Sequence, residues 1–528
     1  MTAVRGGPAG GDGLVLAVDL GTTALKVGLV TLAGQVVATE CHDLPLVLLP
    51  GGGAEQDAVH WWDLVVAAGA RVVAADGTAG GSPSAGRVRA VAVTGQWAST
   101  VPVDADGVPV GPCVMWLDSR GAKEARRRVG GPVSGYDPRH LTAWVRRTGG
   151  APALDGADPL GHRWFLAGER PDVHAAARWL LEPVDYLVMR LTGRAAATQA
   201  SMVASWLTDN RRLDPGGYDA SLVRRSGVAA DKLPPLLQNG SVAGPLLPAV
   251  AARLGLPAGV PVIAGAGDAH AVALGAGAVE LYQGHLSVGT TSWVSCHVPA
   301  KKTDVLHQIA AVPGAMPGRY LVLNNHQTSG RCLQWLRDVL GAGGGQATYP
   351  ELDALAARSA PGAGGVLFTP WLAGERTPVA DRRARGGFHN LSLATGPSEL
   401  VRAVLEGVAY NDRWTLDLVE RFVGRRLDEL RMVGGGARSD LWCQIHADVL
   451  DRTIEQVAEP DHAGLRGAAL GAAVALGELA PRDVRALVPV ARTFRPRPAA
   501  VARYRTLYAE FPRLYRRQRR MFARLNAG

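Results

Sequence analysis

The chain has 528 residues, 47% of them hydrophobic, so it is long enough to form more than one domain with its own core. The formal charge is +9, but this excess is almost entirely arginine and is not concentrated beside exposed aromatic residues in the body of the chain, which favours a compositional bias plus a basic tail over nucleic-acid binding. Five widely separated cysteines without metal or redox spacing argue against a disulfide-rich secreted protein and for a reducing, cytoplasmic compartment.

The chain carries no predicted export or membrane signal. Residues 1–13 lack an apolar core, so they predict a flexible lead-in and not a signal peptide. No apolar run is long and continuous enough to predict a bilayer span. We therefore expect a cytoplasmic protein without a membrane partner.

The first half of the chain predicts a β-meander followed by mixed α/β structure. The apolar run Leu14–Asp19 is typical of a buried strand, and it leads into the turn Gly21-Thr22-Thr23. The elements expected next are strands at 24–30, 35–39 and 88–93, a hairpin at 101–107, a helix at 175–191 that stops at Gly193, and a strand at 260–264. That last strand leads into Gly265-Ala266-Gly267-Asp268.

The second half repeats the opening pattern. A strand predicted at 285–288 runs into Gly289-Thr290-Thr291, which indicates an internal duplication of the first strand and turn. The elements expected next are a helix at 399–419, a strand at 430–433, a helix at 440–450, a Gly/Ala-rich helix at 465–476 and a basic amphipathic helix from Arg492 onward. We expect this basic helix to pack on the second lobe with its arginines outward; nucleic acid or an anionic membrane is the alternative.

A strand that ends in Gly-Thr-Thr can bind phosphate. Its backbone N–H groups point outward, the glycine permits close approach of an anion, and the hydroxyls donate further hydrogen bonds. Asp19 stands at the end of its strand, where a carboxylate could hold Mg²⁺ directly or through water. Two ordinary hairpin turns are the alternative interpretation.

The loop Gly434-Gly435-Gly436-Ala437 is a third glycine-rich connection between a strand and a helix. Such a loop offers a flat surface for a purine ring, or an anion site at a helix N-terminus. A dinucleotide site would need G-x-G-x-x-G at this turn, and the spacing does not fit it.

Asp268 follows a strand and three small residues that leave room for a ligand. A hydroxyl that attacks phosphorus needs a base within hydrogen-bond reach, and an aspartate can serve. The alternative is an aspartate that caps the helix predicted to follow it. Spacing alone leaves both roles open.

In order along the chain, these motifs resemble those of the FGGY carbohydrate kinases, within the wider group that shares the actin and hexokinase ATPase fold. The matching segments are Asp19–Thr23 with Lys26, Leu286–Ser292, Gly374–Pro378, Ala384–Phe388, Glu406–Tyr410 and Val433–Ser439. The resemblance implies an α/β fold with two actin/hexokinase-like (ribonuclease H-like) ATPase lobes and a cleft between them. The implied parts are the lead-in, an N-terminal lobe at 14–277, a C-terminal lobe at 278–485 and a basic helical tail at 486–528.

The resemblance also implies ATP and Mg²⁺ as cofactors and a role for each matching residue. Asp268 matches the catalytic base, and Asp19 and Asp268 are the expected metal-side carboxylates. The residues expected to contact ATP are Asp19, Gly21, Thr22, Thr23, Lys26, Gly289, Thr290, Thr291, Gly434, Gly435, Gly436, Ala437 and Asp440. The residues expected at the sugar are Gln96, Trp97, Trp116, Asp118, Arg120 and Asp268.

The sequence identifies the sugar less sharply than the reaction. The overall layout resembles the xylulokinase branch, which makes D-xylulose the leading substrate. Ala98 replaces the sugar-contacting histidine of that branch, and Ala269 replaces its asparagine, whereas Asp268-Ala269-His270 is closer to ribulokinases. Ribulose, another ketose or a polyol are therefore alternatives, with Trp97 either stacking on the sugar or serving as core.

A different class of function shares the same fold. Non-catalytic sugar sensors and filament-forming ATPases are the alternatives, and the presence of Asp268 argues against a sensor. The sequence does not define the oligomeric state, and a homodimer stays open beside a monomer.

Overall fold

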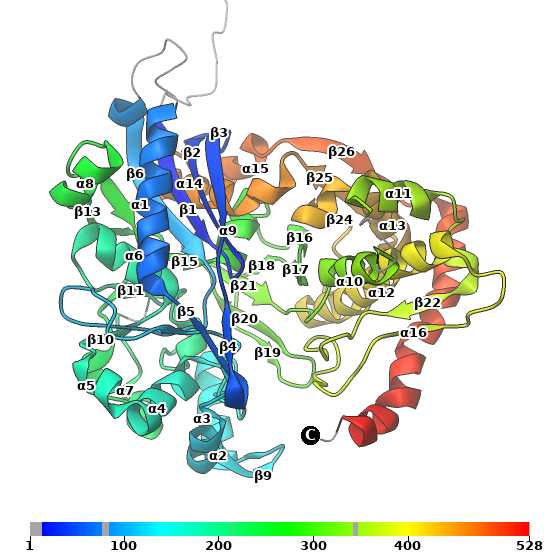
Figure 1. Ribbon diagram of the computed structural model, residues 1–528, viewed down its shortest axis with the longest axis horizontal. Helices are drawn as coiled ribbons and strands as arrows, with labels where there is room; N and C mark the ends of the chain where they lie inside the picture. Colours follow the sequence, from blue (N-terminus) through cyan, green and yellow to red (C-terminus); the bar gives the residue numbers. More distant parts are fainter. Residues whose placement is uncertain (1–12, 76–83, 215, 342–346, 527–528) are drawn as a thin grey trace, which may run out of the picture. The chain divides into compact units, whose positions relative to one another are not determined.

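The computed structural model describes residues 13–75, 84–214, 216–341 and 347–526, and its ribbon is drawn in Figure 1. The predicted lead-in therefore lies, apart from Gly13, outside the described residues. The chain forms two compact units. The first contains the described residues up to Gly275 with 312–320 and 464–487, and the second contains 276–311, 321–463 and 488–526. These units differ from the expected lobes, because two later segments belong to the first unit and the tail belongs to the second.

The first unit is built on a seven-stranded sheet with the order β13-β14-β6-β1-β2-β3, to which β15 adds beside β6. Its strands are β1 (Leu14–Leu20), β2 (Ala24–Thr31), β3 (Val36–Asp43), β6 (Val88–Gly95), β13 (Val242–Pro245), β14 (Pro261–Ile263) and β15 (Ala266–Gly267). β1 pairs with β2 in antiparallel fashion and with β6 in parallel. β2 and β3 are also antiparallel, so the predicted meander is confirmed.

The two faces of this sheet are covered by different helices. Side chains alternate along a strand, so Leu14, Leu16 and Val18 share one core with α1 (Ala58–Ala75). Val15 and Ala17 share another core with α14 (Ala463–Ala475). Asp19 continues the second set, so alternation places its side chain on the α14 face.

The helix α1 is long and apolar enough to cross a membrane by length and composition. On that measure it contradicts the expectation that no apolar run is long enough. Half of the segment is buried inside the protein, where Trp61, Val65 and Val72 belong to the core of the first unit. The apolar side chains of α1 therefore pack against the core of the first unit.

The second unit contains a five-stranded sheet that reproduces the pairing around β1. Its order is β17-β16-β24-β25-β26, formed by β16 (Gly284–Val288), β17 (Ser292–Ser295), β24 (Glu429–Val433), β25 (Thr453–Val457) and β26 (Val490–Phe494). β16 is antiparallel to β17 and parallel to β24, as β1 is to β2 and β6. The predicted duplication is thus confirmed at the level of topology.

One predicted helix is wrong in its first half. The segment expected as a helix at 175–191 forms the end of α5 (Pro171–Ala176), the strand β10 (Trp179–Leu181) and then α6 (Pro183–Thr192). Pro183 suits the first turn of a helix but not its interior, because proline lacks an N–H and its ring clashes with the preceding turn. Gly193 ends α6 with a φ of 71°, as predicted.

The expected helix from Arg492 onward is wrong at its start, because the tail forms β26 as far as Phe494 and only then the helix α16 (Pro498–Leu525). α16 packs within the second unit against α12 (Pro397–Val423). Its buried side includes Tyr504 and Phe511, and the Tyr504 hydroxyl donates to buried Glu406 at 2.7 Å. The arginines of this helix are exposed, so the outward orientation that we expected is confirmed.

The remaining elements complete the two units. They are β4 (Val47–Leu49), β5 (Gly53–Gln56), β7 (Val101–Val103), β8 (Cys113–Val114), α2 (Ala122–Val129), β9 (Gly130–Val133), α3 (Pro138–Thr148), α4 (Pro159–Glu169), β11 (Ala197–Thr198), α7 (Ala220–Ser226), β12 (Leu236–Leu237), α8 (Pro248–Leu254), α9 (Asp268–Gly275), β18 (His297–Val298), β19 (Thr303–Asp304), β20 (Ile309–Pro313), β21 (Tyr320–Leu323), α10 (Gly330–Leu340), α11 (Tyr349–Ala357), β22 (Leu367–Thr369), β23 (Gly387–His389), α13 (Asp440–Leu450) and α15 (Val484–Leu487).

Candidate active site

Asp268 is the first residue of α9 and follows β15 directly. Its Oδ1 accepts a hydrogen bond from the backbone N–H of Ala269, the next residue, at 2.7 Å, whereas a capping side chain accepts from the second or third residue of the helix. Burial and the nearby charge of Asp19 raise the pKa of Asp268 to about 7, while the Ala269 hydrogen bond lowers it. A carboxylate with such a pKa can both accept and release a proton near neutral pH.

Asp19 lies at the end of β1 against the first turn of α14. A Cβ atom added to Gly464 would lie 2.2 Å from Asp19 Oδ2, so only glycine fits beside this carboxylate. Burial raises the pKa of Asp19, and the charge of Lys26, which is directly opposite on β2, lowers it. Sequence reasoning missed Gly464, because nothing in a Gly/Ala-rich helix singles out one glycine.

A network of uncharged side chains holds the first loop, Gly21-Thr22-Thr23, in place. The Thr22 hydroxyl donates to Gln96 Oε1 at 3.4 Å and accepts from Trp116 Nε1 at 3.0 Å. Gln56 Nε2 donates to the Thr22 carbonyl at 2.8 Å, and Gln96 Nε2 donates to Gln56 Oε1 at 3.2 Å. The Thr22 side chain is therefore occupied within the protein, and Gln56 is a second residue that sequence reasoning missed.

The segment predicted to line the sugar site lies beside Asp268. A Cβ atom on Gly267 would be 3.2 Å from the Trp97 ring, so the indole packs on the residue before Asp268. The His270 ring meets the Trp97 ring edge-on, with 6.1 Å between their centroids. Trp97 and Asp268 are thus brought together as expected.

Asp118 and Arg120 are arranged differently from the expectation. Asp118 has no exposed surface, and its Oδ2 accepts from the Ala54 N–H at 2.9 Å and from Arg120 Nη2 at 2.6 Å. Arg120 also pairs with Glu55 at 2.6 Å. This geometry makes Asp118 a support for Arg120 and for the β5 backbone, and leaves it no surface for a ligand.

The second loop, Gly289-Thr290-Thr291, connects β16 to β17 in the second unit. Its Gly289 and Thr290 carbonyls accept hydrogen bonds from the N–H groups of Gly330 and Ser329, at 2.8 and 3.0 Å. Thr290 is exposed. The carbonyls are therefore engaged inside the unit while the tip of the loop meets solvent.

The third loop packs against the end of β16. Gly434 has a φ of 87°, and a Cβ on it would lie 2.6 Å from the Val288 carbonyl oxygen, so glycine is required here by backbone contact. Gly435 is exposed, whereas Ala437 is fully buried and supports the loop from beneath. Asp440, the first residue of α13, is exposed and pairs with Arg492.

Two carboxylates make the first unit suitable for a magnesium ion. Burial raises the pKa of both Asp19 and Asp268, and Asp19 lies close enough for its charge to raise the pKa of Asp268 further. Mg²⁺ usually takes one or two carboxylates and keeps several waters, so this pair fits it. Among the described residues there is no larger cluster of His, Cys, Asp or Glu that could hold a metal.

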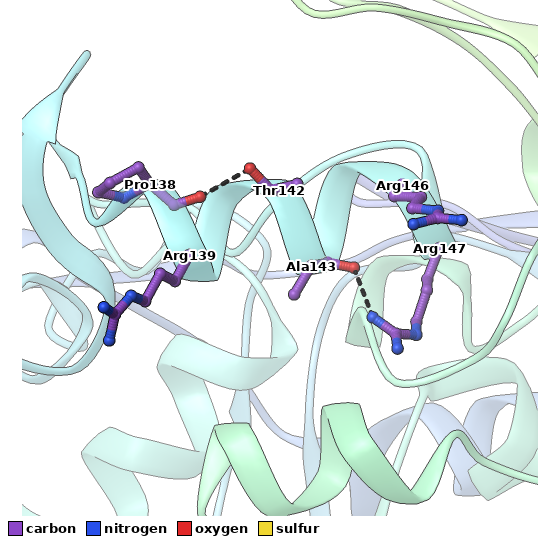
Figure 2. A pocket seen from close by; sticks show the side chains of 6 residues that line it. All are labelled: Pro138, Arg139, Thr142, Ala143, Arg146 and Arg147. Carbon is purple, nitrogen blue, oxygen red and sulfur yellow. Dashed lines mark hydrogen bonds between the residues drawn. The ribbon is translucent and has the colours of Figure 1, made fainter.

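Two hollows elsewhere in the first unit differ in character. One is a shallow surface depression of about 400 Å³ along α3, with Arg139, Arg146 and Arg147 on its rim (Figure 2), and it contains no predicted site residue. The other, of about 310 Å³, is lined by Thr94, His270 and the small residues of α14, which places it next to the segment that carries Asp268.

Known proteins match this chain over nearly its whole length. The N-terminal domain of the FGGY family of carbohydrate kinases matches residues 14–275, and the C-terminal domain of that family matches 284–476. A xylulose kinase of Escherichia coli K12 is 31% identical over 515 residues, covering 95% of this chain and 98% of the relative. A gluconokinase of Bacillus subtilis is 25% identical and covers 95% of each chain.

A solved structure gives the same result for the fold. The crystal structure of a xylulose kinase from Rhodospirillum rubrum aligns with a TM-score of 0.81 at 30% sequence identity, and the alignment covers 96% of this chain and 99% of that one. The expected α/β fold of actin/hexokinase type is confirmed by this likeness and by the two repeated sheets. The chain belongs to the FGGY family of carbohydrate kinases.

Proposed function

We propose that this carbohydrate kinase transfers the γ-phosphoryl group of ATP to a terminal hydroxyl of a ketopentose, with D-xylulose as the first candidate and Asp268 as the base. The observation that carries the proposal is the environment of Asp268. Its carboxylate starts a helix beside the Trp97 ring and Asp19, with a pKa raised to about 7 by burial and by the Asp19 charge.

Asp268 would take the proton from the attacking hydroxyl as the oxygen approaches phosphorus. A base with a pKa near the working pH is deprotonated often enough to act and basic enough to accept the proton. Gly21, Thr23, Gly289 and Thr290 would offer backbone and hydroxyl donors to the phosphates, and Gly435 would offer its exposed backbone to the adenosine.

Asp19 and Asp268 would hold the magnesium ion, with waters completing its shell. When bound, the ion would offset the charge of the phosphates and of the two carboxylates. The N-terminal turn of α14, which abuts Asp19 through Gly464, would keep the Asp19 side chain oriented.

The sugar residues that this geometry favours are Trp97 and Asp268. Gln96 and Trp116 would act from behind them, through their hydrogen bonds to Thr22. Trp97 would stack on the apolar face of the sugar. Ala98 offers no polar side chain, so one hydroxyl contact of the xylulokinase branch is missing, and such contacts discriminate strongly between sugars.

The test is ATP consumption measured with purified enzyme across pentuloses, hexuloses, polyols and aldonates. We expect D-xylulose to give the highest kcat/KM. A higher value with ribulose, a polyol or gluconate would reassign the substrate, and ATP binding without turnover on any compound would favour a non-catalytic sensor. Asp268→Asn should lower kcat by about 10²- to 10⁴-fold and leave ATP binding intact.

Trp97→Ala tests the stacking contact separately. We expect a higher KM for the sugar with an unchanged KM for ATP, because the ring packs beside Gly267, the residue before Asp268. An unchanged sugar KM in a folded variant would remove Trp97 from the site. We further propose a cytoplasmic enzyme without nucleic-acid or membrane partners, as a monomer or a homodimer, which light scattering of the purified protein would decide.

A further inference from the structure

The second loop is followed at once by a buried serine. Ser292 begins β17 and pairs with Val288, the last residue of β16, so it closes the base of the hairpin. The Ser292 side chain has no exposed surface. Its carbonyl accepts a hydrogen bond from the His326 N–H at 2.8 Å.

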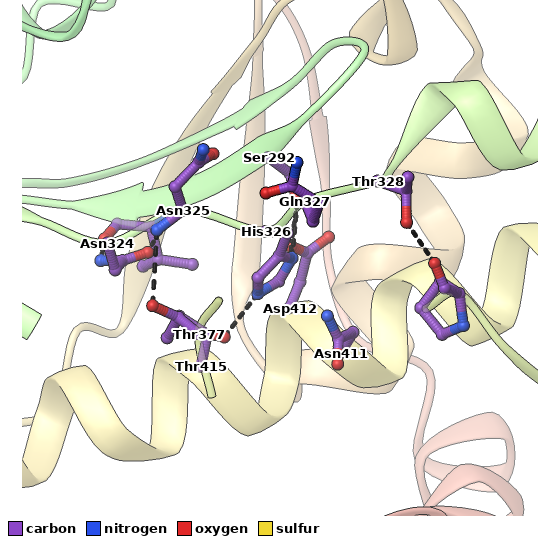
Figure 3. Close-up of polar contacts among 12 residues, drawn as sticks. Ser292, Asn324, Asn325, His326, Gln327, Thr328, Thr377, Asn411, Asp412 and Thr415 are labelled. Atoms are coloured by element: carbon purple, nitrogen blue, oxygen red, sulfur yellow. Dashed lines mark hydrogen bonds and ion pairs between the residues drawn. The ribbon is translucent and has the colours of Figure 1, made fainter. Parts of the chain in front are cut away.

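The Ser292 hydroxyl is held by a carboxylate and a histidine from elsewhere in the second unit (Figure 3). It donates to Asp412 Oδ1 on α12 at 2.7 Å and lies 2.7 Å from His326 Nδ1. His326 Nδ1 is also 3.0 Å from Asp412 Oδ1. The second Asp412 oxygen accepts from His446 Nε2 on α13 at 2.9 Å.

Asp412 is a buried negative charge with two histidine partners. Burial would raise the pKa of its carboxyl, but the hydrogen bonds from His326 and His446 hold that pKa at about 2. The partnership in turn raises the pKa of His326 despite its burial. A buried charge that is paired in this way is costly to disturb, so its neighbours are held in one arrangement.

A serine, a histidine and an aspartate in contact suggest nucleophilic catalysis, but this arrangement excludes it. In a catalytic triad the serine and the aspartate bond to opposite nitrogens of the ring. Here both lie against His326 Nδ1, and Ser292 is inaccessible to any substrate. The role of Ser292, His326 and Asp412 is therefore structural: they hold neighbouring parts of the second unit in place.

Asp412 is connected to the second loop by two chains of contacts. The first is its hydrogen bond from the Ser292 hydroxyl. The other is His326, which precedes the two residues, Ser329 and Gly330, whose N–H groups hold the loop carbonyls. Glu375 ties the same segment down, because its Oε1 accepts from the Gln327 N–H at 2.7 Å. A Cβ on Gly330 would lie 2.6 Å from the Gly289 carbonyl oxygen, so this contact leaves little freedom.

We infer that Asp412 is a positioning residue for the second loop: through Ser292 and His326 it sets where the Gly289–Thr291 backbone meets the phosphates of ATP. The inference rests on the phosphate-binding role proposed above for this loop. Asp412 does not touch ATP. Its effect should therefore appear in ATP kinetics and affinity, with sugar binding unchanged.

The decisive variants are Ser292→Ala and its matched control, Ser295→Ala. Ser295 is a buried serine three residues later on the same strand, and its hydroxyl donates to the Val322 carbonyl instead of to the charged cluster. We expect Ser292→Ala to lower kcat/KM for ATP and ATP affinity about tenfold, with the sugar KM unchanged. Ser295→Ala should leave all three values near wild type. Asp412→Asn should have the larger effect, about 100-fold on kcat/KM for ATP, as expected when a reacting group is displaced by about 1 Å.

Two further variants separate the possible failures. Asp448→Asn removes another buried carboxylate, which pairs with Arg497 away from the loop, and controls for general loss of stability. If Ser292→Ala behaves like Ser295→Ala, the positioning role is overturned. A Thr290→Pro/Thr291→Ala double variant removes the Thr290 N–H and both hydroxyls. If it is then also without effect on ATP affinity, the proposed phosphate role of the loop fails as well; if it weakens ATP binding, only the positioning inference falls. Should Asp412→Asn not fold, Ser292→Ala still decides, because it removes a single hydroxyl.

Discussion

The two Gly-Thr-Thr loops share a topology but are supported by different chemistry. Each joins a strand to an antiparallel neighbour, and the neighbouring parallel strand has a glycine at its carboxyl end: Gly95 is the last residue of β6, and Gly434 directly follows β24. The position opposite the last strand residue is the core residue Leu25 in the first loop and the buried Ser292 in the second. Uncharged amides and an indole hold the first loop, whereas a buried carboxylate with two histidines holds the second.

The two loops also differ in the charge of the residue that precedes them on the strand. The first loop has Asp19 two residues before its glycine, and the second has Ser287 at that position. A carboxylate beside phosphates repels them unless a cation lies between, so the metal ion proposed above belongs with the first loop. In the second unit, the carboxylate that contacts the base of the hairpin is Asp412, which is fully buried. We infer that it positions the loop without contacting the ligand.

The comparison is tested most severely by changing the two equivalent positions. Asp19→Ala should lower kcat by about 10³-fold, because it removes the carboxylate proposed to hold the cation that stabilises the transferred group. Ser287→Ala should change kcat by no more than a few fold. Steady-state kinetics at saturating Mg²⁺ would measure both, and similar losses in the two variants would contradict the division of roles.

The contact between α14 and Asp19 offers the next largest effect. Gly464→Ala places a methyl group 2.2 Å from Asp19 Oδ2, so the carboxylate must move, and we expect kcat/KM for ATP to fall about 100-fold. Gly471→Ala on the same helix is the control, since its nearest neighbour would be 3.5 Å away. That control should retain activity and gain a little helix stability. Equal activity of the two variants would show that the Asp19 position is not critical.

Asp268 is expected to make the activity depend on pH near neutrality. With a pKa of about 7, the basic form of Asp268 declines on the acid side, so kcat/KM for the sugar should fall about tenfold per pH unit below 7. For folding the sign is opposite: the raised pKa contributes stability that is complete below the unfolded value of 3.8 and is lost as pH rises through about 7. A pH–rate profile that stays flat down to pH 5 would rule out Asp268 as the base.

The smallest effect is expected in the uncharged network of the first loop. Trp116→Phe keeps an aromatic ring but removes the 3.0 Å hydrogen bond to Thr22. The loss should be about 1 kcal/mol, which corresponds to roughly a fivefold rise in the ATP or sugar KM. Trp62→Phe, at a core tryptophan of α1, should leave both KM values unchanged. If Trp116→Phe weakened ATP binding as much as Ser292→Ala does, the uncharged network around Thr22 would position its loop as firmly as the network around Asp412.

Much of the fold was predictable because local patterns agree with the final packing. The runs at 14–19, 285–288 and 430–433 form strands, and the two Gly-Thr-Thr repeats pointed to the duplicated sheets. The helix expected at 175–191 is wrong in its first half because Pro183 suits the first turn of a helix and not its interior, so the apolar spacing before it does not continue into one helix. The return of 464–487 to the first unit had no sequence signal, since helix patterns do not say which sheet a helix covers.

The site was predictable where function rests on short motifs and not where it rests on distant contacts. Trp97 and Asp268 could be grouped because each follows a strand end, and the structure places the Trp97 ring against Gly267. Gln56, Gly464 and Asp412 were missed, because each acts through a contact to a residue far away in the chain. Asp118 was expected at the sugar, yet the structure saturates its carboxylate with Arg120 and the Ala54 N–H.

The position of α14 has a consequence for how the protein is made. The face of the first sheet that carries Val15 and Ala17 is completed only by Leu465, Ala469 and Ala472, some 450 residues later. During synthesis from the N-terminus, the first unit cannot close this core until the ribosome has translated almost the whole second unit. Nascent chains that stop before α14 will expose an apolar sheet face, so the two units of this enzyme mature together and not one after the other.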